Sequence, residues 1–290
     1  MSQAVHTMPN LEEIDKLQMI PGVPFSQYYE FFMDWKTAVV IAGAYALTIH
    51  FLNPKTGKLS RVEAKNRGVV EKASKSNPLM TSFVFLHNLA LAIYSMITFY
   101  HMARGINRSW FQRDISMHDA YCDKDEYLWN DSLGYWGYLF YLSKFYEFID
   151  TAIILLKGRR SSLLQTYHHS GAVLTMWSGI RYRATPIWIF VLFNSFVHSI
   201  MYCYYAATCI GLHPPGKRYL TSIQISQFIV GMSLAISYLS VPSCMDTPGQ
   251  RFAVSLNVGY LLPLTYLFVD FARRTYGKRI AAAMASKKAN

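Results

Sequence analysis

Long apolar runs, separated by short polar segments, make up most of the chain. The hydrocarbon core of a bilayer is about 30 Å thick, so a helix that spans it needs roughly 20 apolar residues. Seven runs approach this length: Trp35–Leu52, Leu79–Met102, Ser132–Leu156, Leu163–Ile180, Pro186–Leu212, Tyr219–Val241 and Phe252–Phe271. They lack the alternation of barrel strands. We therefore predict an all-α integral membrane protein with seven transmembrane helices.

Composition agrees with this prediction. Of 290 residues, 52% are hydrophobic and only 16% are charged, which is unusual for a soluble domain of this size. The N-terminal segment contains several acidic residues and lacks the apolar core of a cleavable signal peptide. We expect a polar, partly disordered segment at 1–34, a membrane domain at 35–275 and a tail at 276–290.

Basic residues gather in the segments that would share one side of the membrane. Loop 53–78 carries seven, the loops after the third and fifth runs carry three and two, and the tail carries six; the acids there are Glu63 and Glu71. Because cytosolic loops are rich in Lys and Arg, we expect this side to face the cytosol and the N-terminus to lie in the lumen. The positive face could reflect topology alone, or it could also attract an anionic substrate.

Two further features bear on the compartment. The chain ends in KKAN, and Lys287 and Lys288 resemble the dilysine signal that returns membrane proteins to the endoplasmic reticulum. Cys122 and Cys244 both fall in loops predicted to be luminal, where disulfides can form. A bridge would tie the loop between the second and third runs to the loop between the sixth and seventh. Two free thiols are the alternative.

Four of the apolar runs carry polar side chains at helical spacing. They are Lys144, Glu147, Asp150 and Thr151; Gln165, His168 and His169; Asn194, His198, Tyr202 and Tyr205; and Thr221, Gln224 and Gln227. Spacings of three and four residues put these side chains on one face of each helix. Because ionisable groups inside a membrane usually face a cavity or a partner, we predict one cavity that opens on the cytosolic side and is closed toward the lumen.

Some of these residues have simpler interpretations. Intramembrane amides such as Asn194, Gln224 and Gln227 often hydrogen-bond neighbouring helices. Lys144 and Glu147 could form a neutralised structural pair. Two adjacent histidines, with a third on the next helix at a compatible depth, favour a functional role more strongly.

A metal site is a weaker alternative. Membrane di-iron enzymes need many histidine ligands in several clusters, whereas the chain has nine histidines in total and His87 is isolated in the second run. His168, His169 and His198 could hold one zinc ion. Adjacent residues point about 100° apart on a helix, so at most one of the pair would join His198. We expect no metal and no other cofactor.

The polar segments together resemble the ELO family of very-long-chain fatty acid elongases, the membrane 3-ketoacyl-CoA (3-oxoacyl-CoA) synthases of the endoplasmic reticulum. KFYEFIDT matches the family's K-x-x-E-x-x-D-T, NSFVHSIMYCYY matches N-x-x-x-H-x-x-M-Y-x-Y-Y, and TSIQISQF matches T-x-x-Q-x-x-Q-F. The order of the motifs agrees, and the resemblance covers about residues 35–275. In the family's H-x-x-H-H box, Gln165 stands where the first histidine is usual. This does not argue against activity, but it argues against any role at this position that needs a titratable imidazole.

The resemblance implies a seven-helix fold in which six helices form a barrel around a tunnel closed at the lumenal side. It also implies that a long-chain acyl-CoA condenses with malonyl-CoA, giving a 3-oxoacyl-CoA two carbons longer, CO₂ and CoA. The implied partners are these substrates, the lipids of the endoplasmic reticulum, and the reductases and dehydratase of the elongation cycle. No nucleic acid is expected.

Each polar residue has a chemical role in such a reaction. A neutral His168 could attack the thioester and form an acyl-imidazole. His198 could orient the thioester, transfer a proton, or stabilise negative charge with Asn194. Glu147 and Asp150 could fix imidazole tautomers, although Asp150 could instead pair with the lysine of its helix.

The expected site falls into three groups. The catalytic set is His168, His198, His169, Glu147 and Asp150. The residues expected to bind substrate are Lys144, Gln165, Asn194, Tyr202, Tyr205, Gln224 and Gln227. The phosphates of CoA would meet Lys157, Arg159, Arg160, Lys217 and Arg218.

Two other classes of function stay open. A seven-helix receptor or lipid transporter would share the topology, but the cytosol-side cavity, the short loops and the KKAN tail argue against it. A lipid oxidase with one or two metal ions is the other alternative, and metal analysis of the purified protein would test it.

Overall fold

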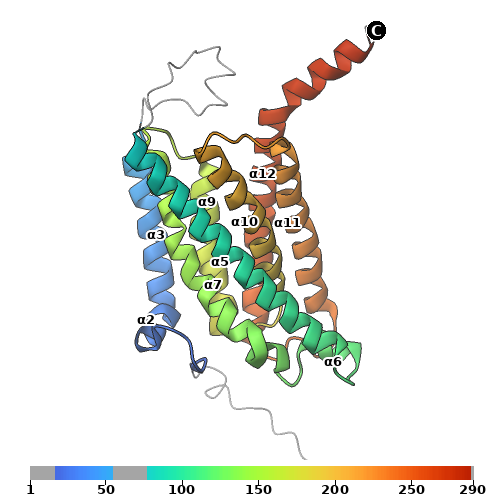
Figure 1. Cartoon of the computed structure of the whole chain (residues 1–290). Coiled ribbons are helices and arrows are strands. Elements are labelled where there is room, and N and C mark those ends of the chain that lie inside the picture. The colour runs from blue at the N-terminus through green and yellow to red at the C-terminus, as the bar shows by residue number, and fades with distance from the viewer. Residues whose placement is uncertain (1–16, 55–76, 289–290) are drawn as a thin grey trace, which may run out of the picture.

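The computed structural model describes residues 17–54 and 77–288, and all the regular structure in these ranges is helical (Figure 1). Two short helices of other types, the 3₁₀ helix η1 (Ser26–Tyr28) and the π-helix η2 (Trp129–Leu133), accompany the α-helices. The helices are α2 (Tyr29–Met33), α3 (Trp35–Leu52), α5 (Pro78–Phe111), α6 (Met117–Cys122), α7 (Gly134–Tyr146), α8 (Phe148–Leu156), α9 (Leu163–Arg181), α10 (Ile187–Cys209), α11 (Lys217–Ser240) and α12 (Pro248–Lys288).

Several helices begin where a polar side chain can cap them. The Asp34 carboxylate accepts from the Lys36 amide at the start of α3, and the Asn77 side chain accepts from the Leu79 amide at the start of α5. The Ser162 hydroxyl likewise accepts from the Gln165 amide at the start of α9. Such caps satisfy amides that have no partner within the helix, which explains why these helices begin beside the apolar runs.

Within the described residues, five helices are long and apolar enough to cross a membrane: α3, α5, α10, α11 and residues 248–277 of α12. The chain is therefore a multi-pass membrane protein. The third predicted run, Ser132–Leu156, is divided at Glu147 into α7 and α8, so neither part has the length of a span. The fourth run is the single helix α9, whose polar residues lower its hydropathy. The arrangement of six helices in a closed barrel stays a prediction.

The helices form one bundle in which neighbours along the chain are not always neighbours in space. α9 packs against α3, α7 and α12, and α10 packs against α5 and α11. α5 runs obliquely across the front of the bundle in Figure 1. Gly171 of α9 lets α12 approach closely, because a Cβ at this position would collide with the Tyr260 ring. This contact brings the polar face of α9 against α12.

The end of the N-terminal segment is part of the packed fold, which differs from the polar segment expected at 1–34. Tyr29 and Met33 of α2 are each only 1% exposed. The Trp177 indole donates to the Met33 carbonyl, and the Tyr141 hydroxyl donates to the Phe32 carbonyl. The aromatic residues of this stretch therefore pack across one end of the bundle. The rest of the predicted segment, residues 1–16, lies outside the described residues.

The same end of the bundle, here called the α6 end, is closed by a covalent link. A disulfide joins Cys122 of α6 to Cys244 in the loop between α11 and α12. Beside it, His118 donates to the Pro242 carbonyl and contacts Asp119. These two contacts raise the pKa of the His118 imidazole above its usual value, so protonation strengthens the link between α6 and this loop.

Some basic residues used in the topology prediction lie outside the described residues. All seven from loop 53–78 fall between positions 55 and 76. The backbone of α12 extends through Lys287 and Lys288, but their side chains are not among the described ones. Orientation and retrieval to the endoplasmic reticulum stay predictions.

Replacing both Cys122 and Cys244 with Ala is expected to lower the melting temperature of the full chain in detergent micelles. The bridge connects residues 122 positions apart, and closure of a loop of this length stabilises a fold by about 2–4 kcal/mol. Cys203→Ala, at a free cysteine, is the control and should leave the melting temperature almost unchanged. Equal melting temperatures for the two variants would contradict the prediction.

Candidate active site

The interruption between α7 and α8 holds a buried ion pair. The Lys144 ammonium donates to Glu147 Oε1 at 2.6 Å, and both residues are 2% exposed. Lys144 Nζ also donates to Asn194 Oδ1 at 3.3 Å and lies 3.8 Å from the centre of the Phe140 ring. A charge inside an apolar bundle requires such partners because it has lost its water. The pair therefore links α7 to α10 at the point where α7 ends.

The ion pair also sets the orientation of His198. Because an ammonium group can only donate, the side-chain oxygen of Asn194 must face Lys144, and the Asn194 amide nitrogen then donates to His198 Nε2 at 3.2 Å. The neutral imidazole consequently carries its hydrogen on Nδ1, which lies 3.7 Å from Glu147 Oε1. Lysine, glutamate, histidine and asparagine thus form a closed ring of polar contacts. Glu147 Oε2 is buried and has no hydrogen-bond partner in the described part of the chain.

Asp150 has different partners from those predicted. Its Oδ1 accepts from His87 Nε2 at 2.8 Å, and its Oδ2 accepts from the Tyr202 hydroxyl at 2.7 Å. Neither contact involves the lysine or the three histidines expected in the site. The interpretation of His87 as an isolated residue was wrong, because α5 packs along α10 and brings His87 to the start of α8. Sequence spacing carries no information on that crossing.

His169 is held by the unusual member of its motif. Gln165 Nε2 lies 2.8 Å from His169 Nε2 and 3.3 Å from Thr151 Oγ1. An amide N–H donates, so His169 Nε2 is an acceptor and its hydrogen is on Nδ1. The Tyr45 hydroxyl lies 2.7 Å from Thr151 Oγ1 and extends the network to α3. In this chain Gln165 therefore orients one histidine of the pair.

His168 is held by Tyr260 of α12, a residue absent from the predicted site. The Tyr260 hydroxyl donates to the His168 carbonyl oxygen at 3.0 Å and also lies 3.0 Å from His168 Nδ1. Since a hydroxyl has one hydrogen, Tyr260 donates to the carbonyl and accepts from Nδ1–H. His168 Nε2 then keeps its lone pair and has no hydrogen-bond partner among the described residues. The sequence did not distinguish Tyr260 from the other tyrosines of the apolar runs, because this residue has no polar neighbours at helical spacing that match one of the motifs.

Three residues of the predicted site lie apart from the histidines. Tyr205 is 38% exposed, and its ring centre is 6.4 Å from that of Tyr202. Gln224 contacts the Met201 sulfur at 3.3 Å. Gln227 lines a cavity, and its Oε1 is buried without a hydrogen-bond partner among the described residues.

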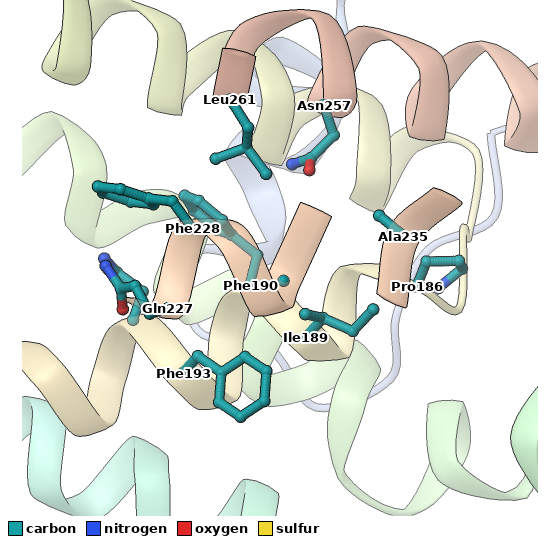
Figure 2. A pocket seen from close by; sticks show the side chains of 11 residues that line it. Pro186, Ile189, Phe190, Phe193, Gln227, Phe228, Ala235, Asn257 and Leu261 are labelled. Atoms are coloured by element: carbon teal, nitrogen blue, oxygen red, sulfur yellow. The ribbon is translucent and has the colours of Figure 1, made fainter. Parts of the chain in front are cut away.

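This cavity lies between α10, α11 and α12 (Figure 2). Its lining residues are Pro186, Ile189, Phe190, Phe193, Asn194, Gln227, Phe228, Gly231, Ala235, Asn257 and Leu261. Asn194 and Gln227 supply polar groups at one end, and the lining toward the α6 end is apolar apart from Asn257. Beyond Pro186 and Ala235 the Trp188 indole donates to the Tyr238 hydroxyl, whose ring stacks on Tyr121. Closure of the cavity at the α6 end stays a prediction.

In the described part of the chain, one group of three potential metal ligands has its atoms within 4.8 Å: His118, Cys122 and Cys244. It lies at the α6 end, and its two sulfurs are bonded to each other. The three histidines of the predicted site, which are not among the residues that line the cavity, contact Tyr260, Gln165 and Asn194.

Comparison with known proteins finds one family profile and several similar proteins that are named fatty acid elongases. The sequence profile of the family described as ELO: GNS1/SUR4 matches residues 30–284. The chain is 32% identical over 168 residues to "Fatty acid elongase sre1" of Dictyostelium discoideum, a match that spans 57% of this chain and 61% of that protein. It is 29% identical over 215 residues to "Fatty acid elongase A" of the same organism, spanning 71% and 76%. It is also 27% identical over 275 residues to "Putative fatty acid elongase 1" of Schizosaccharomyces pombe, spanning 91% and 74%.

Lys144→Met is expected to destabilise the protein by about 3–5 kcal/mol, because it leaves Glu147 as a buried charge without its partner. The double variant Lys144→Met/Glu147→Gln removes both charges and should recover most of this loss. Thermal unfolding of the purified chain in micelles measures both effects. A double variant as unstable as the single one would show that the ion pair is not what Lys144 contributes.

Proposed function

The chain belongs to the ELO (GNS1/SUR4) family, and from this premise we propose that it is the condensing enzyme of fatty acid elongation. In this reaction a long-chain acyl-CoA and malonyl-CoA, with uptake of one proton, give a 3-oxoacyl-CoA two carbons longer, CO₂ and CoA. The enzyme is a very-long-chain 3-oxoacyl-CoA synthase, which is an acyltransferase. It uses no cofactor beyond its two substrates.

The observation that carries the proposal is the contact between His168 and Tyr260. Because Tyr260 accepts from Nδ1–H, the lone pair of Nε2 is available to a substrate. A neutral imidazole with a free nitrogen is a competent nucleophile toward a thioester. His168 Nε2 forms a bond to the acyl carbon, the carbon–sulfur bond breaks, and the CoA thiolate takes up a proton and leaves.

The second half of the reaction makes the carbon–carbon bond. Malonyl-CoA loses CO₂, and the electron pair of the broken bond becomes the enolate of its thioester. The enolate carbon attacks the acyl carbon, the bond to Nε2 breaks, and His168 returns to its neutral form. Atoms and charge balance without an external oxidant or reductant.

Asn194 and His198 supply the charge stabilisation that this step needs. Asn194 lines the cavity, and one of its amide hydrogens is committed to His198 while its oxygen is committed to Lys144. The second amide hydrogen is the donor that we assign to the enolate oxygen. A donor fixed from both sides does not have to reorganise when charge develops, which is the basis of electrostatic catalysis. His169 and Gln165 hold the adjacent face of the site.

Both substrates enter from the end of the bundle remote from α6. The acyl chain occupies the apolar cavity, with Gln227 at its polar end. The CoA groups lie toward the end of the bundle remote from α6, where Lys157, Arg159, Arg160, Lys217 and Arg218 would meet the phosphates. Tyr205 and Gln224 line the approach, while Tyr202 is buried and donates to Asp150. We place the protein in the membrane of the endoplasmic reticulum, with this end in the cytosol, beside the reductases and dehydratase of the cycle.

The nucleophile is tested with labelled acyl-CoA and the purified full chain. Wild type should release CoA without malonyl-CoA, retain the acyl label, and convert it to product when malonyl-CoA is added. His168→Ala should lose both steps. Tyr260→Phe should keep them with rates reduced about three- to tenfold, because a neutral hydrogen bond is worth about 0.5–1.5 kcal/mol. Undiminished labelling of His168→Ala would exclude the acyl-imidazole, and absence of any turnover by wild type would favour a receptor or transporter.

The cavity is tested by filling its far end. Ala235→Phe places a ring where Ala235 now lines the cavity, so the longest product should shorten by at least one elongation cycle. Ile236→Phe is the matched control, because Ile236 is 45% exposed on the outer surface of the same helix turn. Lipid profiles of cells that express each variant measure the difference. Identical profiles for the two variants would mean that the acyl chain lies elsewhere.

A further inference from the structure

His87 of α5 occupies a built site that the proposed reaction does not use. The residue is 3% exposed, and its ring lies against Tyr146, with centres 5.3 Å apart and planes 29° from parallel. The ring centre of Phe83 is 6.3 Å away. His87 Nε2–H donates to Asp150 Oδ1 at 2.8 Å, while Nδ1 lies 3.4 Å from the Tyr146 hydroxyl. The ring is thus fixed by packing on its faces and by polar contacts at both nitrogens.

The partner of His87 is fully committed. Each oxygen of Asp150 accepts one hydrogen bond, from His87 and from Tyr202, at 2.8 and 2.7 Å. The side chain of His87 is 1% exposed, whereas that of Asp150 is 20% exposed. A carboxylate held on both oxygens is poorly placed to take a proton from a substrate. It is well placed to fix the direction of the Tyr202 hydroxyl.

Tyr202 connects this cluster to the catalytic histidine of α10. The Tyr202 ring is 1% exposed and meets the His198 ring edge to face, with centres 5.2 Å apart and planes at 88°. The two residues are four positions apart on α10, so they stack along one face of the helix. A continuous series of contacts therefore runs from His87 through Asp150 and Tyr202 to His198.

We propose that His87 is a positioning residue of the condensation reaction: it holds the Asp150 carboxylate, which through Tyr202 fixes the ring of His198. This inference rests on the proposed function, since it assumes that His198 and Asn194 act on the malonyl thioester. His168 is anchored separately, by Tyr260 of α12. The contribution of His87 is therefore specific to the second half of the reaction.

The test compares His87→Leu with His87→Gln in the full chain. The leucine removes the donor, so Asp150 Oδ1 loses its partner and Tyr202 its fixed direction; the rate of condensation should fall roughly 10- to 100-fold, the cost of a misplaced catalytic group. Formation of the acyl-enzyme from acyl-CoA alone should change less than twofold. Glutamine keeps an N–H at nearly the same reach and should restore most of the rate.

Two controls separate positioning from stability. Asn88→Ala alters a side chain 5% exposed on the same helix that donates to the Val84 carbonyl; it should lower the melting temperature without changing the condensation rate of the folded protein. Asp150→Asn should lose about as much rate as His87→Leu, and the double variant should lose no more, because both act through one contact.

The outcomes are distinct. A folded His87→Leu variant with an unchanged condensation rate would overturn the role of His87. The role would also be overturned if His87→Leu lowered the rates of both half-reactions only to the extent that it lowered the melting temperature. If His87→Leu does not fold, His87→Gln and Asp150→Asn decide the question alone. Failure of wild type to form an acyl-enzyme would instead remove the proposed function.

Discussion

Burying an ammonium and a carboxylate inside an apolar helix bundle is possible only if each charge is matched, and Lys144 and Glu147 meet this requirement where α7 ends and α8 begins. Glu147 closes the last turn of α7, and Lys144 reaches across to Asn194 of α10. The pair therefore connects α7 to α10 inside the bundle. Without the ammonium group of Lys144, nothing would require the amide oxygen of Asn194, and not its nitrogen, to face α7.

The ion pair determines which groups donate and which accept in the neighbouring hydrogen bonds. Lys144 can only donate, so the orientation of Asn194 and the tautomer of His198 follow. The Tyr260 hydroxyl has a single hydrogen, and its donation to a carbonyl makes His168 present a lone pair at Nε2. Neither inference requires a titrating group: donor and acceptor counts alone decide which nitrogen is free. Buried polar networks are conformationally specific because an unsatisfied member is costly.

The apolar lining of the cavity is the second feature on which the proposed chemistry depends. The cavity has amides at one end and aromatic side chains beyond the other, and the latter are held by the stack of Tyr121 on Tyr238. The disulfide of α6 joins Cys122, the residue that follows Tyr121, to Cys244. The packed N-terminal residues Tyr29 and Met33 close the same end of the bundle. The disulfide, the aromatic stack and the packed N-terminal residues thus all lie at the α6 end, whereas Lys144, Glu147 and Asn194 lie away from it.

The sequence by itself determined the helical class, most helix positions and the faces on which polar residues gather, because these depend on the period of one helix and on local caps such as Asp34 and Ser162. It also singled out His168, His169 and His198 as candidates for one site, which stays a prediction. It could not show that α8 breaks away at Glu147, that His87 reaches Asp150, or that Tyr260 holds His168. Those contacts join different helices, and they depend on how far each helix is rotated and where it crosses its neighbour. Only close packing of the whole bundle, including Gly171 against Tyr260, decides those two quantities.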